Sequence, residues 1–152
     1  MHYLGIADIP FVQNSLYISF IWSIVAVIFL TIIHLFYFYI LIPNNKFSIY
    51  WENISWRKIF RFFYTSFIEE VWFRGVFLLL LFNIIEYPAI LISAIFFTIM
   101  HHSREAQIFA FLMGILFGFI VIYTNNIIGP FLGHWIFNII NYNFIGPVKI
   151  KK

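Results

Sequence analysis

Cysteine is absent from this chain of 152 residues, and only 10% of its residues are charged. Without cysteine, disulfide bonds, thiolate catalysis and cysteine-ligated metal sites are excluded. Charge this sparse is not typical of water-soluble domains, in which about a quarter of the residues are charged. The small net charge, +3, comes from lysines and arginines in the expected loops, so no nucleic-acid partner is expected.

What the chain has instead is apolar sequence: 63% of its residues are hydrophobic, 24% are aromatic, and the mean hydropathy is +0.95. About 20 apolar residues cross a bilayer as a helix, so there is room for four or five spans with short loops. We therefore predict an all-α polytopic membrane protein. It would form a single membrane domain, residues 1–152, with a bundle of about five transmembrane helices around a polar cavity.

The apolar runs and their polar boundaries give the expected spans. The loop after the first run is rich in aromatic and basic residues, as is typical of a segment at the membrane interface. Within the fourth run, Gly114-x-x-x-Gly118 predicts close contact with another helix. The expected spans cover residues 15–42, 62–85, 88–101, 106–123 and 130–145, with an interfacial segment at 47–61 and a core that carries the polar motifs at 62–145.

Lysine and arginine fall in alternate loops, which predicts the orientation in the membrane. Cytoplasmic loops carry the excess of positive charge. This rule places the N-terminus outside and the C-terminus in the cytoplasm of a multi-pass protein of the cell membrane. The loop cations are Lys46, Arg57, Lys58, Arg61, Arg104, Lys149, Lys151 and Lys152.

Three short polar clusters interrupt the apolar spans. An ionisable residue inside a membrane is costly, about 3 kcal/mol at a helix centre, and is therefore a functional-site hypothesis by default. The clusters are Glu69-Glu70-x-x-x-Arg74, Phe97-x-x-x-His101 and His134-x-x-x-Asn138.

Spacing within the first cluster separates the two glutamates. On an α-helix Glu70 and Arg74 share a face and can form an ion pair, whereas Glu69 is rotated by about 100° and is left unpaired. An unpaired carboxylate at such a depth can be poised as a general base. The alternative is a structural ion-pair network that includes all three residues.

The other two clusters place polar groups on single helix faces. His101 shares a face with Phe97, although a histidine at the end of a span can also be merely interfacial. His134 and Asn138 could stabilise the oxyanion that forms when an amide is attacked, or they could form a hydrogen-bonded seam between helices. His34 stands alone in the first span, and we interpret it as structural.

Taken together, the three motifs resemble those of the CAAX-protease and bacteriocin-processing family, also called the Abi family, of intramembrane proteases. The resemblance covers residues 69–138 and includes the run at 126–134. It implies a glutamic-type endopeptidase without a cofactor that cleaves a membrane-associated protein or peptide. In this family pattern the water is activated by Glu69 with His101, the oxyanion is stabilised by His134 and Asn138, and the site is supported by Glu70, Arg74 and Phe97.

Two alternatives remain open. A zinc-dependent version of the protease would use Glu69, His101 and His134 as ligands, but the chain has no His-Glu-x-x-His helix, and no carboxylate that would orient a ligating histidine is evident. A non-catalytic membrane protein, such as a bacteriocin-immunity factor, would use the same polar residues only for packing.

Helix geometry places the two motif histidines at different depths. At 1.5 Å per residue, His101 lies about 20 Å and His134 about 6 Å from the outer ends of their spans, which is too far apart for one substrate carbonyl. The segment from Asn125 to Gly133 is interrupted by glycine and proline. We therefore expect irregular backbone there that dips into the membrane and brings the histidines together.

Overall fold

A computed structural model describes residues 15–41, 47–48, 55–144 and 146–147. These residues form helices joined by short loops, together with one antiparallel pair of two-residue strands. In chain order the elements are α1 (Ser15–Leu41), β1 (Phe47–Ser48), α2 (Trp56–Glu70), the π-helix η2 (Val71–Leu78), α3 (Leu79–Ile85), α4 (Pro88–Ile99), α5 (Arg104–Thr124), α6 (Ile128–Phe144) and β2 (Gly146–Pro147).

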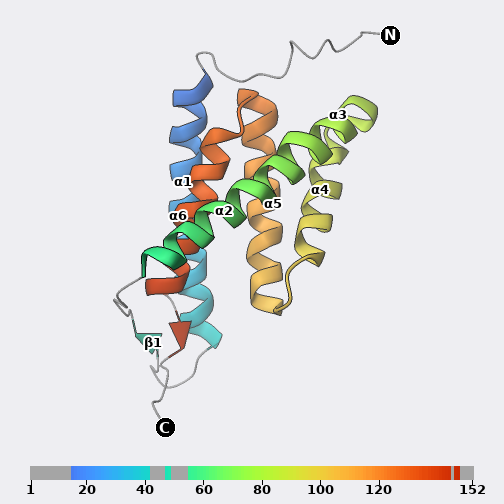
Figure 1. Ribbon diagram of the computed structural model, residues 1–152. Coiled ribbons are helices and arrows are strands. Elements are labelled where there is room, and N and C mark those ends of the chain that lie inside the picture. Colours follow the sequence, from blue (N-terminus) through green and yellow to red (C-terminus); the bar gives the residue numbers. More distant parts are fainter. Residues whose placement is uncertain (1–14, 42–46, 49–54, 145, 148–152) are drawn as a thin grey trace.

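The helices form a bundle that is crossed by one oblique rod (Figure 1). Helices α1, α4, α5 and α6 run along the bundle, where α1 packs against α5 and α6, and α4 packs against α5. Helices α2, η2 and α3 follow one another without a break and cross the bundle diagonally, with α2 on α6 and η2 against α4 and α5. The oblique rod therefore touches each helix that carries another polar motif.

The predicted spans correspond to the observed helical rods, so the all-α bundle is confirmed. The second span begins earlier than expected, because residues 56–61 of the expected interfacial segment form the first turns of α2. Residues 49–54 of that segment lie outside the described residues, as do the N-terminus before residue 15 and the basic tail at 148–152.

Large apolar side chains cover the outer surface, as expected for helices that face lipid rather than water. Tyr17, Ile32, Trp72, Leu80 and Ile84 are all more than half exposed. By length and apolar composition, Leu16–Ile40 and Arg104–Thr124 could each cross a membrane, and Pro88–Ile99 is a shorter apolar helix. The fold is thus that of a helical membrane protein.

Glycines set the closest helix contacts, as the Gly114-x-x-x-Gly118 spacing predicts. A Cβ on Gly114 would lie 2.7 Å from Ala94 Cβ, and one on Gly118 would lie 2.9 Å from Ile90 Cγ2, so α5 rests directly on α4. The contact between α1 and α6 is tighter still, because a Cβ on Gly129 would lie 2.5 Å from the backbone carbonyl carbon of Ser19.

The expectation of irregular backbone from Asn125 to Gly133 is wrong for most of this segment. Only residues 125–127 are irregular, and α6 is helical from Ile128 onward. Pro130 is compatible with this first turn, where a backbone N–H has no partner within the helix. The segment is nevertheless buried, with Asn126 only 2% exposed, because Gly129 lets it lie against α1.

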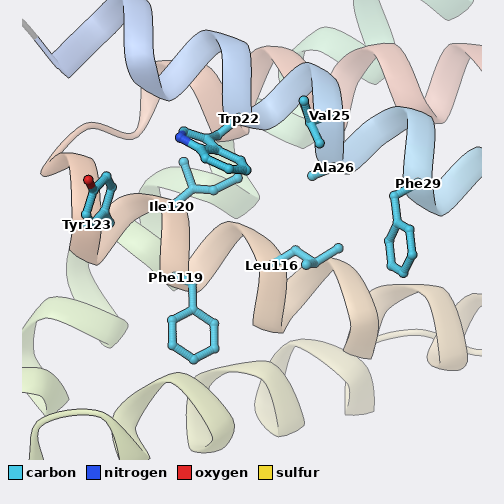
Figure 2. A pocket seen from close by; sticks show the side chains of 8 residues that line it. All are labelled: Trp22, Val25, Ala26, Phe29, Leu116, Phe119, Ile120 and Tyr123. Carbon is cyan, nitrogen blue, oxygen red and sulfur yellow. The ribbon is translucent and has the colours of Figure 1, made fainter.

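An apolar groove of about 580 Å³ lies between α1 and α5. Figure 2 shows its lining, which includes Trp22 and Phe29 from α1 and Phe119 and Tyr123 from α5. No ionisable motif residue lines it, so this groove is not the chemical site.

Candidate active site

A buried ion pair forms the base of the polar site. Arg74 Nη1 lies 3.1 Å from Glu70 Oε1, and the two side chains are 1% and 0% exposed. The contact is the one that the four-residue spacing predicts. The helix changes from α to π immediately after Glu70, and π turns are rare and are frequently found at functional sites.

Several polar atoms of the ion pair form no hydrogen bond with the described residues. Among the described residues, neither Glu70 Oε2 nor the two terminal nitrogens of Arg74 has a hydrogen-bond partner, since the 3.1 Å contact is not aligned as a hydrogen bond. A buried polar group without a partner costs about 1–3 kcal/mol. The pair therefore stabilises the fold less than a fully satisfied network would.

His134 lies between the two glutamates. Its Nδ1 donates to Glu70 Oε1 at 2.8 Å, and its Nε2 lies 3.6 Å from Glu69 Oε2. His134 is buried, whereas the Glu69 side chain is 37% exposed. Glu69 is therefore the carboxylate of this site that an incoming substrate or water can reach.

The ring of Phe97 connects the three motifs. It is 1% exposed, and the Arg74 guanidinium lies 4.2 Å from its centroid. Its centroid is 4.8 Å from that of the His101 ring and 5.8 Å from that of His134. Both histidines therefore contact one phenyl ring, so they lie close together, as we expected, although residues 128–133 are helical rather than irregular.

The orientation of His101 is fixed by two backbone contacts. Its Nδ1 donates to Phe97 O at 2.9 Å, and its own carbonyl accepts a hydrogen bond from Gln107 Nε2 at 2.9 Å. A neutral imidazole that donates through Nδ1 has an acceptor at Nε2. Within the described residues His101 reaches the site through Phe97, with no direct hydrogen bond to Glu69.

Asn138 joins the site through a residue that sequence reasoning missed. Its Nδ2 donates to the Oγ of Ser66 at 3.0 Å, and Ser66 is fully buried. The available signal was the four-residue spacing of Ser66, Glu70 and Arg74, which places all three on one face of the oblique rod. The serine extends the polar stripe by one turn.

Glu70 has a wider role than its predicted one. Besides pairing with Arg74, it accepts the Nδ1 hydrogen bond of His134, and it thereby fixes which nitrogen faces Glu69. A carboxylate in this position also orients metal-bound histidines, so the expectation that no such carboxylate is present is wrong. Among the described residues, however, no three His, Asp or Glu side chains gather closely enough to hold a metal ion.

A groove of about 540 Å³ opens beside the loop that carries His101. It lies between the end of α4 and the first turns of α5, and Thr98, Arg104, Gln107 and Phe111 are among its lining residues. Since Gln107 also holds the carbonyl of His101, this groove is next to the polar site and large enough to accept a few side chains of a peptide.

Comparison with known proteins agrees with the geometry. The family model of type II CAAX prenyl endopeptidases, Rce1-like, matches residues 51–140. The chain belongs to this Rce1-like family. No curated protein and no solved structure matches it. The matched range includes every motif residue, so the chain is a membrane-embedded peptide hydrolase, an intramembrane protease of the CAAX-protease and bacteriocin-processing type.

Proposed function

We propose that this Rce1-like protein is a glutamic-type intramembrane endopeptidase, in which Glu69 is the general base. The observation that carries the proposal is the contrast between two adjacent carboxylates. Glu70 is fully buried and is engaged by Arg74 and His134, whereas Glu69 is partly exposed and faces His134 Nε2 at 3.6 Å. A general base needs a free lone pair within reach of water, and Glu69 has one.

In the proposed reaction a water molecule is held by Glu69, with the free Nε2 of His101 as a second acceptor. The water attacks the peptide carbonyl, a C–O bond forms, and its proton passes to Glu69. The tetrahedral intermediate then collapses, the C–N bond breaks, and Glu69 returns the proton to the leaving amine. The products are one new carboxyl end and one new amino end, so the atoms balance without a cofactor.

His134 and Asn138 would stabilise the negative oxygen of this intermediate. Nδ1 of His134 is engaged by Glu70, so the ring presents only Nε2 to the substrate. When Nε2 also carries a proton, Glu70 balances the charge of the ring, and the group of Glu69, Glu70, Arg74 and His134 is neutral overall. Removal of one such donor typically costs about 10²–10³ in kcat.

The substrate is proposed to be a membrane-associated protein or peptide, cut near its exit from the bilayer. The lining of the groove beside His101 includes Arg104, a cation that we place on the cytoplasmic side by the positive-inside rule. The same rule supports five spans in the cell membrane, with the N-terminus outside and the C-terminus in the cytoplasm. Reporter fusions at 149–152 test this orientation, and labelling of that tail from outside would contradict it.

The test of the function uses the full chain in lipid vesicles with a panel of single-span peptides that differ in sequence near the interface. Mass spectrometry in H₂¹⁸O identifies each cut, because hydrolysis places ¹⁸O in the new carboxyl end. Glu69→Gln is expected to lower turnover by about 10²-fold or more with an unchanged melting temperature. The matched control is Glu86→Gln, at the exposed corner between α3 and α4, which is expected to cleave normally.

Two results would overturn the proposal. Normal cleavage by Glu69→Gln would exclude Glu69 as the base. A folded wild-type chain that cuts no peptide of the panel would favour the non-catalytic alternative, in which the polar residues only pack the bundle.

A further inference from the structure

A second buried polar cluster lies outside the motifs, around His34 on α1. His34 is 3% exposed. Its Nδ1 lies 2.6 Å from Asn141 Oδ1, and its Nε2 lies 2.9 Å from Glu105 Oε1. Both ring nitrogens are therefore engaged, each by a different helix.

The rings around His34 hold it in place. Its centroid is 4.8 Å from that of Phe38, 4.2 Å from that of Phe109 and 6.2 Å from that of Phe137. An imidazole packed on three phenyl rings, with both nitrogens engaged, has little freedom to rotate. This cluster is rigid, and it has no free ring nitrogen to offer a substrate.

The partners of His34 belong to the two helices that position the active site. Glu105 is in the first turn of α5, two residues before Gln107, whose Nε2 donates to the His101 carbonyl. Asn141 is on α6, one turn beyond Asn138 and two beyond His134. One side chain on α1 thus connects the helix that holds the His101 loop to the helix that carries the oxyanion donors.

We infer that His34 is a positioning residue of the protease, which fixes the His101 loop relative to His134 and Asn138 through Glu105 and Asn141. The inference rests on the proposed function. The inference follows from the contacts of His34 with Glu105 and Asn141. Apart from them, the start of α5 is joined to the His101 loop by short-range contacts, such as the hydrogen bond from Ala106 N to Ser103 Oγ. Displacement of a reacting group by about 1 Å can cost 10²-fold in rate.

The test compares four variants in the peptide-cleavage assay. His34→Phe keeps the ring packing and removes both polar contacts, and kcat is expected to fall about 10-fold or more while KM changes little. His34→Gln can donate to Glu105 and can accept from the Asn141 amide once that amide turns, and should recover part of this loss. Thr31→Val, which removes a hydroxyl bonded only to Val27 O of its own helix, is expected to be neutral. Leu30→Ala lowers stability from the same helix and the same apolar core while leaving both polar contacts of His34 in place.

A purely structural role predicts different results. If kcat of His34→Phe falls no further than that of Leu30→Ala at an equal loss of melting temperature, the positioning role is wrong. A second readout is the ¹⁵N NMR signal of the His101 ring, which should shift in His34→Phe and stay fixed in Thr31→Val. An unshifted signal would also contradict the inference.

The two proposals fail in different ways. Activity in Glu69→Gln would end the proposed mechanism whatever His34 does. Wild-type cleavage that is lost in Glu69→Gln and kept in His34→Phe would leave the function standing and remove only the positioning role.

Discussion

His34 and His134 are almost equally buried, at 3% and 2% exposure, and each lies between two oxygen-bearing side chains. They differ in how completely those neighbours engage them. At His34 both contacts are short, 2.6 and 2.9 Å. At His134 one contact is short, 2.8 Å, and the other, to Glu69, is 3.6 Å.

The difference shows how a fixed cluster and a reactive one can be told apart when burial cannot separate them. Around His34 both ring nitrogens are engaged. Around His134, Glu70 Oε2 and both terminal nitrogens of Arg74 have no hydrogen-bond partner among the described residues. What separates the two clusters is the longer contact of His134 to Glu69, whose side chain is 37% exposed, because a carboxylate that water can reach and that is not engaged at short range can act as a base.

The largest expected effect separates the two histidines directly. His134→Phe is expected to lower kcat by about 10²–10³, because the phenyl ring offers no donor to the oxyanion. His34→Phe is expected to lower it by about 10-fold or more, because only positioning contacts are lost. Parallel steady-state kinetics measure this contrast. Equal losses in the two variants would remove the distinction between a reactive and a fixed cluster.

The next largest effect concerns the carboxylate beside each histidine, Glu70 at His134 and Glu105 at His34. Glu70→Gln leaves Arg74 charged and unpaired, which is expected to cost about 3 kcal/mol of stability. Adding Arg74→Met to Glu70→Gln should recover part of that stability. Glu105→Gln should cost less than about 1 kcal/mol, since Glu105 is 40% exposed and its contact is a partly solvated one.

Thermal melts in detergent compare these variants. Glu70→Gln that melts like the wild type would mean that Arg74 finds another partner. A double variant that melts below Glu70→Gln would mean that the pair is not the source of the loss.

The sequence predicts the helices well and the contacts between them less well. Apolar runs and polar boundaries give each of the five rods, because the pattern depends on local hydrophobicity. The π-helix at Val71–Leu78 was not predictable in this way, since one extra residue per turn leaves no mark in an almost uniformly apolar segment. The dip at Asn125 to Gly133 was wrong because glycine was interpreted as a helix breaker, whereas Gly129 allows α1 to approach a regular helix.

In the candidate site, too, the contacts within one helix were predicted and the contacts between helices were not. Helical spacing predicts the Glu70–Arg74 pair and separates Glu69 from it, because these are contacts within one rod. The contact of Glu70 with His134 joins residues 64 positions apart, and spacing along one helix says nothing about it. His34 was interpreted as structural, yet its partners Glu105 and Asn141 are 71 and 107 positions away and were not predicted.

A smaller effect is expected at the helix contact that both clusters share. α1 carries His34 and α6 carries His134, and the two helices meet at Gly129, where an added Cβ would lie 2.5 Å from Ser19 backbone. Gly129→Ala should therefore separate them and cost about 1–3 kcal/mol. Gly75→Ala is the control, since its Cβ would lie 3.7 Å from Ile127 Cδ1, an ordinary contact. Similar melting temperatures for the two variants would contradict the tight α1–α6 contact.

The smallest expected effect is that of metal removal, for which we predict no change in cleavage after exhaustive chelation. The Glu70 carboxylate could orient His134 as a zinc ligand as well as it could orient His134 as an oxyanion donor. This contact therefore does not distinguish a zinc-dependent protease from a glutamic one. The decision rests on a third ligand, since catalytic zinc sites use three protein ligands. His101 is the remaining candidate, and its ring is held by the Phe97 carbonyl within its own helix end. Cleavage and metal content measured before and after chelation test this. The contrary result is stoichiometric zinc whose removal abolishes cleavage and whose return restores it. It would mean that His101 moves to bind zinc together with Glu69 and His134, and that the protease is zinc-dependent.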